Sequence, residues 1–207
     1  LWAASDDGLI HLTQDGGKSW NNVTPKGMNE GIVNSIEISP HDKGTVYVAF
    51  TRYKFGDLSP SIYKTTNYGK SWTKRVKGIE DDAFVRVVRE DPVKRNLLYA
   101  GTETGLYLSL DGGKLWEKFQ LNLPIVPITD LTIRNNDLVA STRRVFFSSR
   151  RFIFSNDAKS KSKPFFDTAA TPPKLLSSER SPDTGLFNAK TISYGASTFC
   201  SGGLRER

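Results

Sequence analysis

The chain has 207 residues and a net charge of +7, with 37% hydrophobic and 25% charged residues. This length fits one domain or two small ones, and no apolar run approaches the roughly 18 residues that a membrane-spanning helix needs. The single cysteine, Cys200, excludes an internal disulfide framework, and with only two histidines the chain has few ligands for a zinc site. The net charge alone favours an anionic partner such as nucleic acid or a membrane surface.

Six short runs of β-branched and aromatic residues predict β-strands in the first half of the chain. Each run is bounded by Pro, Gly, Asn or Asp, which form turns and end strands. The runs occupy residues 35–38, 45–50, 61–64, 84–88, 96–100 and 105–108. No stretch has a sustained apolar period of 3.6 residues with helix caps, so the sequence predicts an all-β fold.

An eight-residue pattern, which we call the box, occurs at residues 13–20, 65–72 and 109–116. It consists of a hydroxyl residue, any residue, Asp or Asn, any residue, Gly, Lys, usually Ser, and Trp. Its defining residues are Thr13, Asp15, Gly17 and Trp20, then Thr65, Asn67, Gly69 and Trp72, then Ser109, Asp111, Gly113 and Trp116. The tryptophans are 52 and 44 residues apart, and the eight additional residues lie around 53–60. Four-stranded units of about 40 to 50 residues are typical of β-propeller blades.

Each box has a structural interpretation that requires no catalysis. The Asp or Asn side chain can bond backbone N–H groups of its own turn, and the glycine supplies backbone angles that a side chain would oppose. The tryptophan buries a large ring against a neighbouring strand. Because three copies of a catalytic group at these spacings would serve no single reaction centre, we interpret each box as a connection between two strands of a blade.

The boxes resemble the Asp-box, or BNR, repeat of sialidase-type and sortilin-type (Vps10) β-propellers. Residues 8–20, with 89–92 and 98–103, are similar to large bacterial proteins with a sortilin-like N-terminal propeller, which are often labelled glycosyl hydrolases. The resemblance covers about residues 1–142. It implies that the boxes lie in peripheral hairpins, away from the central channel where such folds bind ligands, and it favours a secreted or periplasmic protein. The third box departs from the pattern at Leu115, which weakens one turn hydrogen bond.

Three boxes and a partial fourth unit correspond to about three to three and a half blades, whereas closed propellers typically use about four to eight. We therefore expect a partial β-propeller. Its open edges would be covered by missing blades or by self-association. A site in the central channel would lack part of its wall, which argues against catalysis by this chain alone.

The net charge lies entirely in the C-terminal tail. Residues 1–142 contain 17 basic and 17 acidic residues, whereas residues 143–207 contain 12 and 5, together with 11 serines and no tryptophan. The tail has no box, and its composition is typical of a disordered segment. We expect an incomplete propeller at 1–142 and an irregular, poorly ordered, basic tail at 143–207, whose sequence a reading-frame change would also explain.

Three functions fit the sequence. The first is a non-enzymatic binding or scaffold module for a protein or a glycan, without cofactor or metal, within a larger sortilin-like protein. The second is a glycoside hydrolase of sialidase or xyloglucanase type, which needs two carboxylates about 5 to 10 Å apart; its candidate catalytic residues are Glu90 and Glu103. Asp81, Asp82 and Asp91 are further acidic candidates, but each is also explained as a loop or turn residue without a catalytic role. The third is nucleic-acid binding by the basic tail.

Overall fold

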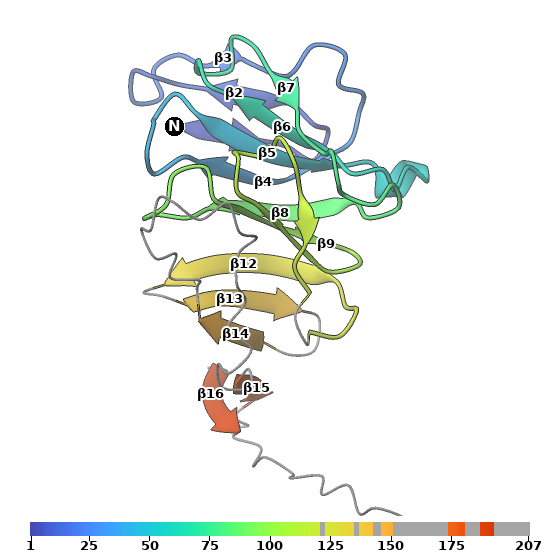
Figure 1. Cartoon of the computed structure of the whole chain (residues 1–207). Helices are drawn as coiled ribbons and strands as arrows, with labels where there is room; N and C mark the ends of the chain where they lie inside the picture. Colours follow the sequence, from blue (N-terminus) through green and yellow to red (C-terminus); the bar gives the residue numbers. More distant parts are fainter. Residues whose placement is uncertain (121–122, 135–136, 143–145, 151–173, 181–186, 193–207) are drawn as a thin grey trace, which may run out of the picture.

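The structure is a computed structural model that describes residues 1–120, 123–134, 137–142, 146–150, 174–180 and 187–192. These residues form sixteen strands and one short 3-10 helix, η1. Figure 1 shows the chain coloured along the sequence from the N-terminus, in blue. In chain order the elements are β1 (Trp2–Ala4), β2 (Ile10–Leu12), β3 (Asn21–Asn22), β4 (Ile32–Ile38), β5 (Val46–Thr51), η1 (Tyr53–Phe55), β6 (Ile62–Thr65), β7 (Thr73–Lys74), β8 (Val85–Glu90), β9 (Leu98–Thr102), β10 (Leu106–Ser109), β11 (Glu117–Lys118), β12 (Ile128–Arg134), β13 (Asp137–Thr142), β14 (Phe146–Arg150), β15 (Lys174–Arg180) and β16 (Phe187–Ile192).

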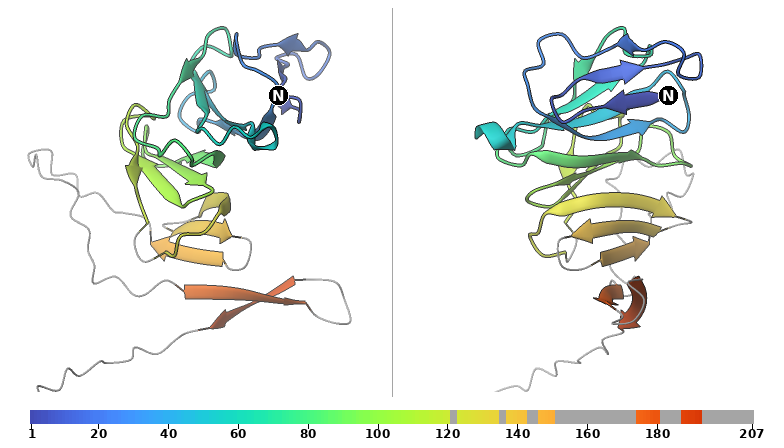
Figure 2. Two further views of the ribbon diagram at one scale, coloured as in Figure 1. Left: turned by 90° about the vertical axis from the view of Figure 1, so that its right-hand side faces the viewer. Right: turned by 180° about the vertical axis from the view of Figure 1, so that it is seen from behind.

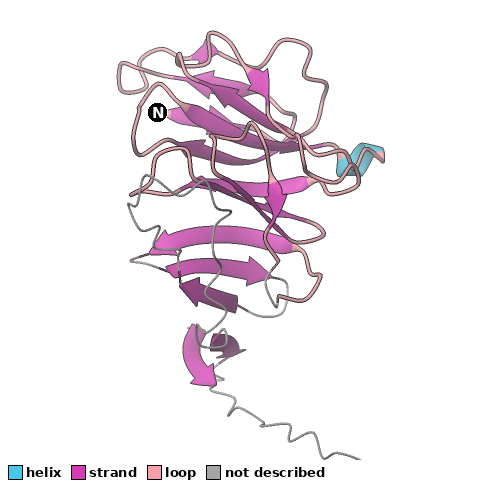
Figure 3. Cartoon of the chain, in the orientation of Figure 1, coloured by secondary structure: helices cyan, strands magenta, loops and turns pink. Residues whose placement is uncertain are grey.

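The strands form four antiparallel sheets (Figure 3). The first sheet contains β1 to β3, the second β4 to β7, the third β8 to β11 and the fourth β12 to β16, and each strand pairs with the next one along the chain. In the left view of Figure 2 the sheets follow one another in a curved row. The predicted all-β fold is confirmed, and η1 is the single helical turn that the described residues contain.

The six predicted strands correspond to β4, β5, β6, β8, β9 and β10. The largest difference is at β4, which starts at Ile32 because Ile32 and Val33 pair with Thr51 and Phe50 of β5. The sequence does not predict β3, β7 and β11, which directly follow the three box tryptophans. Each has only two residues, too few to show the alternation that marks a strand.

Part of the tail is regular where the sequence analysis expects an irregular segment. The structure describes β14, β15 and β16, and all three belong to the fourth sheet, where β13 pairs with β14. The rest of residues 143–207 lies outside the described residues. The boundary after Thr142 therefore stays a prediction, and it falls between two paired strands of one sheet.

The core lies between neighbouring sheets. Tyr47, Ile62, Leu98, Tyr107 and Trp116 pack between the second and third sheets, and each is at most 2% exposed. A second cluster between the third and fourth sheets includes Leu97, Tyr99, Phe119, Ile128 and Leu131. Every residue of β5 and β9 is buried, because each strand has a sheet packed on either side. The sequences of these two strands are consequently almost continuous apolar runs, as is typical of strands covered on both faces.

Candidate functional site

The strands β4, β8 and β12, which we call the inner strands, begin the second, third and fourth sheets, and β8 contacts both of the others. Each has one bulge, at Asn34, Arg86 and Thr129, where an extra residue interrupts pairing with the next strand. Bulges redirect side chains and often lie near functional sites. Three residues beyond the bulge, the equivalent positions are occupied by Glu37, Arg89 and Thr132.

Polar side chains of one inner strand bind the backbone edge of the next. Asn34 Nδ2 donates to the Val85 carbonyl at 2.9 Å, and Glu37 Oε1 accepts the Glu90 N–H at 3.2 Å. Arg89 Nε repeats the arrangement one sheet further on, donating to a β12 carbonyl at 2.9 Å. An open strand edge invites pairing with other chains, so these contacts protect the inner edge while joining the sheets.

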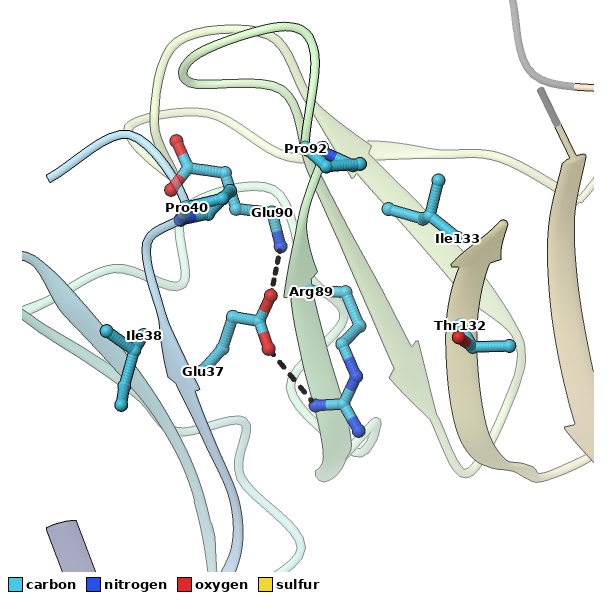
Figure 4. Close-up of a pocket in the computed structure, with 8 residues that line it drawn as sticks. All are labelled: Glu37, Ile38, Pro40, Arg89, Glu90, Pro92, Thr132 and Ile133. Carbon is cyan, nitrogen blue, oxygen red and sulfur yellow. Dashed lines mark hydrogen bonds and ion pairs between the residues drawn. The ribbon is translucent and has the colours of Figure 1, made fainter. Parts of the chain in front are cut away.

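Arg89 lies at the centre of an ionic cluster that joins the three inner strands. Its Nη1 lies 3.6 Å from Glu37 Oε2, a pair drawn in Figure 4, and its Nη2 lies 2.8 Å from Asp130 Oδ1. The side chains of Arg89 and Glu37 are 24% and 20% exposed, whereas that of Asp130 is 64% exposed. Burial raises the pKa of Glu37, although a backbone N–H of β8 and the Arg89 charge oppose the shift.

A cavity of about 200 Å³ opens beside this cluster, at the C-terminal ends of the inner strands. Sites for small organic molecules usually measure about 300 to 1,000 Å³, so the cavity has room for a single side chain or a comparable group. One wall residue, Ile38, is 47% exposed. The residues that line the cavity, shown in Figure 4, are Glu37, Ile38, Pro40, Arg89, Glu90, Pro92, Thr132 and Ile133.

The two candidate catalytic residues, Glu90 and Glu103, lie at opposite ends of β8. Glu90 is its last residue, is 3% exposed, and accepts the Asn96 N–H through Oε1 at 2.9 Å. Glu103 lies beyond the other end, where its N–H donates to Phe84 O and its Oε2 lies 2.6 Å from Arg86 Nη2. The five residue steps of β8 span about 17 Å. The two carboxylates therefore do not form a pair of the spacing that glycosidases use.

The other three acidic candidates do not join the cavity wall. Asp91 is fully buried, and its Oδ1 accepts the N–H groups of Val93 and Lys94, each at 2.8 Å, within a turn. Asp81 and Asp82 are exposed in the loop before β8. These positions agree with their interpretation as turn and loop residues.

The box residues bond to one another in the hairpins β2–β3, β6–β7 and β10–β11. In the first box, Thr13 Oγ1 accepts the Gly17 N–H at 2.9 Å, and Asp15 accepts the Ser19 N–H at 3.0 Å and its hydroxyl at 2.6 Å. Gly17 has φ = +97°, a left-handed angle that favours glycine. The same bond recurs at 3.0 Å in the other two boxes. In the second box (Thr65, Asn67, Gly69) the glycine N–H donates to the threonine hydroxyl, and in the third (Ser109, Asp111, Gly113) it donates to the serine hydroxyl.

Two of the box tryptophans reach back to the preceding sheet. Trp72 Nε1 donates to Val23 O at 2.7 Å, and Trp116 Nε1 donates to Arg75 O at 3.0 Å. Both acceptors lie three residues after the tryptophan of the preceding box. Trp20 has no preceding sheet within the described residues and is 45% exposed. The tryptophan thus joins neighbouring sheets on the side away from the inner strands.

We expect acid to destabilise the protein partly through its boxes. Hydrogen bonds from the Ser19 hydroxyl and N–H hold the pKa of Asp15 well below its ordinary value near 3.8. At Asp111 burial acts in the opposite direction, but bonds from the Leu115 N–H and the Ser109 hydroxyl keep the pKa low. A carboxylate with a lowered folded-state pKa contributes stability above its unfolded pKa, and that stability is lost as the pH falls through the folded value.

The second box supplies the matched comparison, because Asn67 already occupies the aspartate position. Between about pH 5 and about pH 2, the denaturation midpoint of the double variant Asp15→Asn, Asp111→Asn should fall less steeply than that of the unaltered chain. Far-UV circular dichroism during urea titration measures both midpoints. Equal slopes would show that these two carboxylates do not contribute to acid sensitivity.

Glu37 and Asp130 are not among the candidate residues predicted from the sequence. A signal for Glu37 is nevertheless present, because Glu37 and Arg89 each lie three residues before a repeated proline, Pro40 or Pro92. Opposite charges at one repeat position indicate a contact between neighbouring repeats. Asp130 carries no such signal, since β12 is followed by no equivalent proline.

No protein-family model matches the sequence, and no curated protein matches it. Among solved structures, the chain is similar to YCF48 bound to a D1 peptide, with a TM-score of 0.54 and 17% identity over 72% of this chain and 47% of that one. It is also similar to YCF48 from Cyanidioschyzon merolae, with a TM-score of 0.53 and 17% identity over 91% and 66% of the two chains. The GH74 xyloglucanase from Xanthomonas campestris is similar with a TM-score of 0.54 and 19% identity over 72% of this chain and 24% of that one.

These similarities identify the fold as part of a β-propeller, in which the four sheets are blades. The chain spans about half of the first structure and about a quarter of the xyloglucanase. Within the part of the chain that the structure describes, no helix is long and apolar enough to cross a membrane. The same residues contain no group of three His, Cys, Asp or Glu side chains placed to hold a metal ion.

Proposed function

We propose that the chain is a non-catalytic binding module of a β-propeller, whose partner is a protein or a glycan. The observation that carries the proposal is the state of the carboxylates beside the cavity. Glu37 is bonded to Arg89 and to a backbone N–H, and Asp130 is bonded to the same guanidinium. The third carboxylate, Glu90, accepts the Asn96 N–H within its own blade. A glycosidase needs one carboxylic acid to donate a proton and a second carboxylate to attack or to activate water. Glu37 and Asp130 bonded in this way serve as connections between blades.

The wider assignment rests on the boxes. Their hydroxyl, aspartate, glycine and tryptophan contacts support membership of the Asp-box (BNR) class, with a sortilin-like (Vps10) relationship, and a structural role for all twelve box residues. The structure of YCF48 bound to a D1 peptide supports a peptide partner, because its fold is similar. In the complete propeller, further blades or a second copy would cover the open faces of the first and fourth sheets.

Activity assays with the full chain test the non-catalytic part of the proposal. We expect no release of reducing sugar from xyloglucan and no release of nitrophenol from aryl glycosides between about pH 4 and about pH 8. Turnover that disappears in Glu37→Gln, Glu90→Gln or Glu103→Gln, while circular dichroism stays unchanged, would contradict it. Binding is measured separately, by the rise in Tm that peptides or oligosaccharides cause without being consumed.

A glycoside hydrolase is the second candidate function. One observation favours it: burial raises the pKa of Glu37, and a general acid needs a raised pKa. Its second carboxylate would come from Glu90 or Asp130, which border the same region. The same assays decide between the two functions, since only the hydrolase loses turnover on Glu37→Gln.

A further inference from the structure

The connection between β5 and β6 is longer than the fold requires. It runs from residue 52 to residue 61, whereas the equivalent connection in the third sheet, between β9 and β10, covers only residues 103–105. The third sheet still forms four paired strands with this short turn. In Figures 1 and 3 the longer connection projects from the stacked sheets and carries η1. We call residues 52–61 the projecting loop.

The projecting loop is held in shape by its own contacts. Arg52 and Asp57 form an isolated bridge, and Arg52 Nη1 lies 3.3 Å from Asp57 Oδ2. Asp57 Oδ1 also accepts the Ser59 N–H at 3.0 Å and its hydroxyl at 2.6 Å. Arg52 Nε donates to Glu30 O at 2.8 Å, which ties the loop to the segment before β4. Loops fixed before binding lose less conformational entropy when a partner docks.

This loop presents three large apolar side chains to solvent: Tyr53, Phe55 and Leu58 are 41%, 53% and 45% exposed. The Tyr53 ring stacks on Phe84, with centroids 5.4 Å apart and planes 14° from parallel. The Arg52 guanidinium lies over the Phe55 ring, 5.3 Å from its centroid. Aromatic side chains in rigid surroundings are frequent centres of protein interfaces.

Four of the charged residues around these side chains form two ion pairs. Arg52 pairs with Asp57, and Arg86, whose guanidinium also lies over the Phe84 ring, pairs with Glu103. Lys54 is also exposed in the loop, so the surface is mainly apolar with a slight positive charge. A sugar would need polar groups aimed at its hydroxyls, but Asp57 and Arg52 are engaged within the loop. An apolar partner without basic residues is the better match.

We propose that the projecting loop docks an apolar peptide segment of another protein, without basic residues, through Tyr53, Phe55 and Leu58. The proposal goes beyond the binding role argued for the inner strands. The loop follows β5 at Thr51, which pairs with Ile32 at the start of β4. The cavity lies at the other end of β4, about 20 Å away, so changes in one site should leave the other intact.

A selection experiment tests the docking role. The full chain is used to select from a displayed library of random peptides about a dozen residues long. We expect enriched peptides that are apolar and lack basic residues. Their Kd should rise about tenfold or more in the triple variant Tyr53→Ser, Phe55→Ser, Leu58→Ser.

The matched control is the triple variant Val93→Ser, Leu110→Ser, Ile125→Ser, which removes apolar side chains that are 43% to 75% exposed elsewhere. It should leave the Kd unchanged. The single variant Phe55→Ser retains the Tyr53 stack on Phe84 and should still weaken binding about threefold. Circular dichroism confirms that each variant is folded.

Several results would overturn the docking role. They are failure to enrich peptides, enrichment of basic peptides, and equal loss of binding in the loop and control variants. Loop-dependent binding of neutral glucose or xylose oligosaccharides would make the partner a sugar, and loop-dependent self-association in analytical ultracentrifugation would make it a second copy. Turnover of glycosides would contradict only the non-catalytic function, because its assay does not involve the loop.

Discussion

Replacing Trp116 with alanine should lower the free energy of unfolding by about 3 to 5 kcal/mol, because removal of a large buried side chain leaves a cavity. Trp116 is 2% exposed within the cluster between the second and third sheets, and its Nε1 donates to Arg75 O. Such a loss is a large share of the roughly 5 to 15 kcal/mol that stabilises a typical domain. Urea denaturation of the full chain, followed by circular dichroism, measures it.

The first box provides the matched control, because Trp20 has the same sequence context but is 45% exposed. Trp20→Ala should cost less than about 1 kcal/mol. If Trp116→Ala leaves too little folded protein, Trp116→Phe keeps most of the ring volume and should cost about 1 to 2 kcal/mol. Equal costs at Trp20 and Trp116 would mean that the buried contact between blades adds no stability.

Replacing Arg89 with alanine should cost about 2 to 4 kcal/mol. The variant leaves the largely buried Glu37 carboxylate without its cation and removes the donor to Leu131 O. Removing one partner of a buried ion pair is costly, because an uncompensated charge remains. Asp130 adds little to this cost, since it is 64% exposed and surface pairs contribute weakly.

Two further variants separate this cluster from a general charge effect. Arg134→Ala removes an exposed arginine from β12 and should change stability by less than about 0.5 kcal/mol. Arg89→Lys should restore only part of the loss, because lysine cannot direct several fixed N–H groups at once. In a double-mutant cycle of Glu37→Ala with Arg89→Ala, a coupling energy near zero would refute the inter-blade pair.

The repeated units can be recognised in the sequence because the blades share the same turn and have equivalent buried strands. Trp20, Trp72 and Trp116 fix the repeat, and the runs around Tyr47 and Tyr99 locate strands covered on both faces. The eight additional residues between the first two tryptophans correspond to the projecting loop. Its length is visible in the sequence, but its conformation depends on the Arg52–Asp57 pair and on Phe84, which comes from a later blade.

The inner-strand cluster is harder to predict, because it depends on which residues the bulges bring together. The bulges at Asn34, Arg86 and Thr129 break the alternation of polar and apolar residues, but the sequence does not show which side chains they bring together. The separation of Glu90 from Glu103 follows from the direction of β8 and from the turn after β9. Sequence spacing alone therefore makes these two acids equal candidates, although one is buried and the other is paired with Arg86.

The contact between the second and third blades is held by hydrogen bonds at its outer side and at its inner side, and the two sets come from different blades. Between the second and third blades, Trp116 of the later blade bonds backward at the outer side, whereas Asn34 and Glu37 of the earlier blade bond forward at the inner side. Tilting one blade outward stretches the inner bonds, and tilting it inward stretches the tryptophan bond. The angle between these two blades is thereby fixed from both directions, so the curvature of the row at this contact does not depend on closure of a ring.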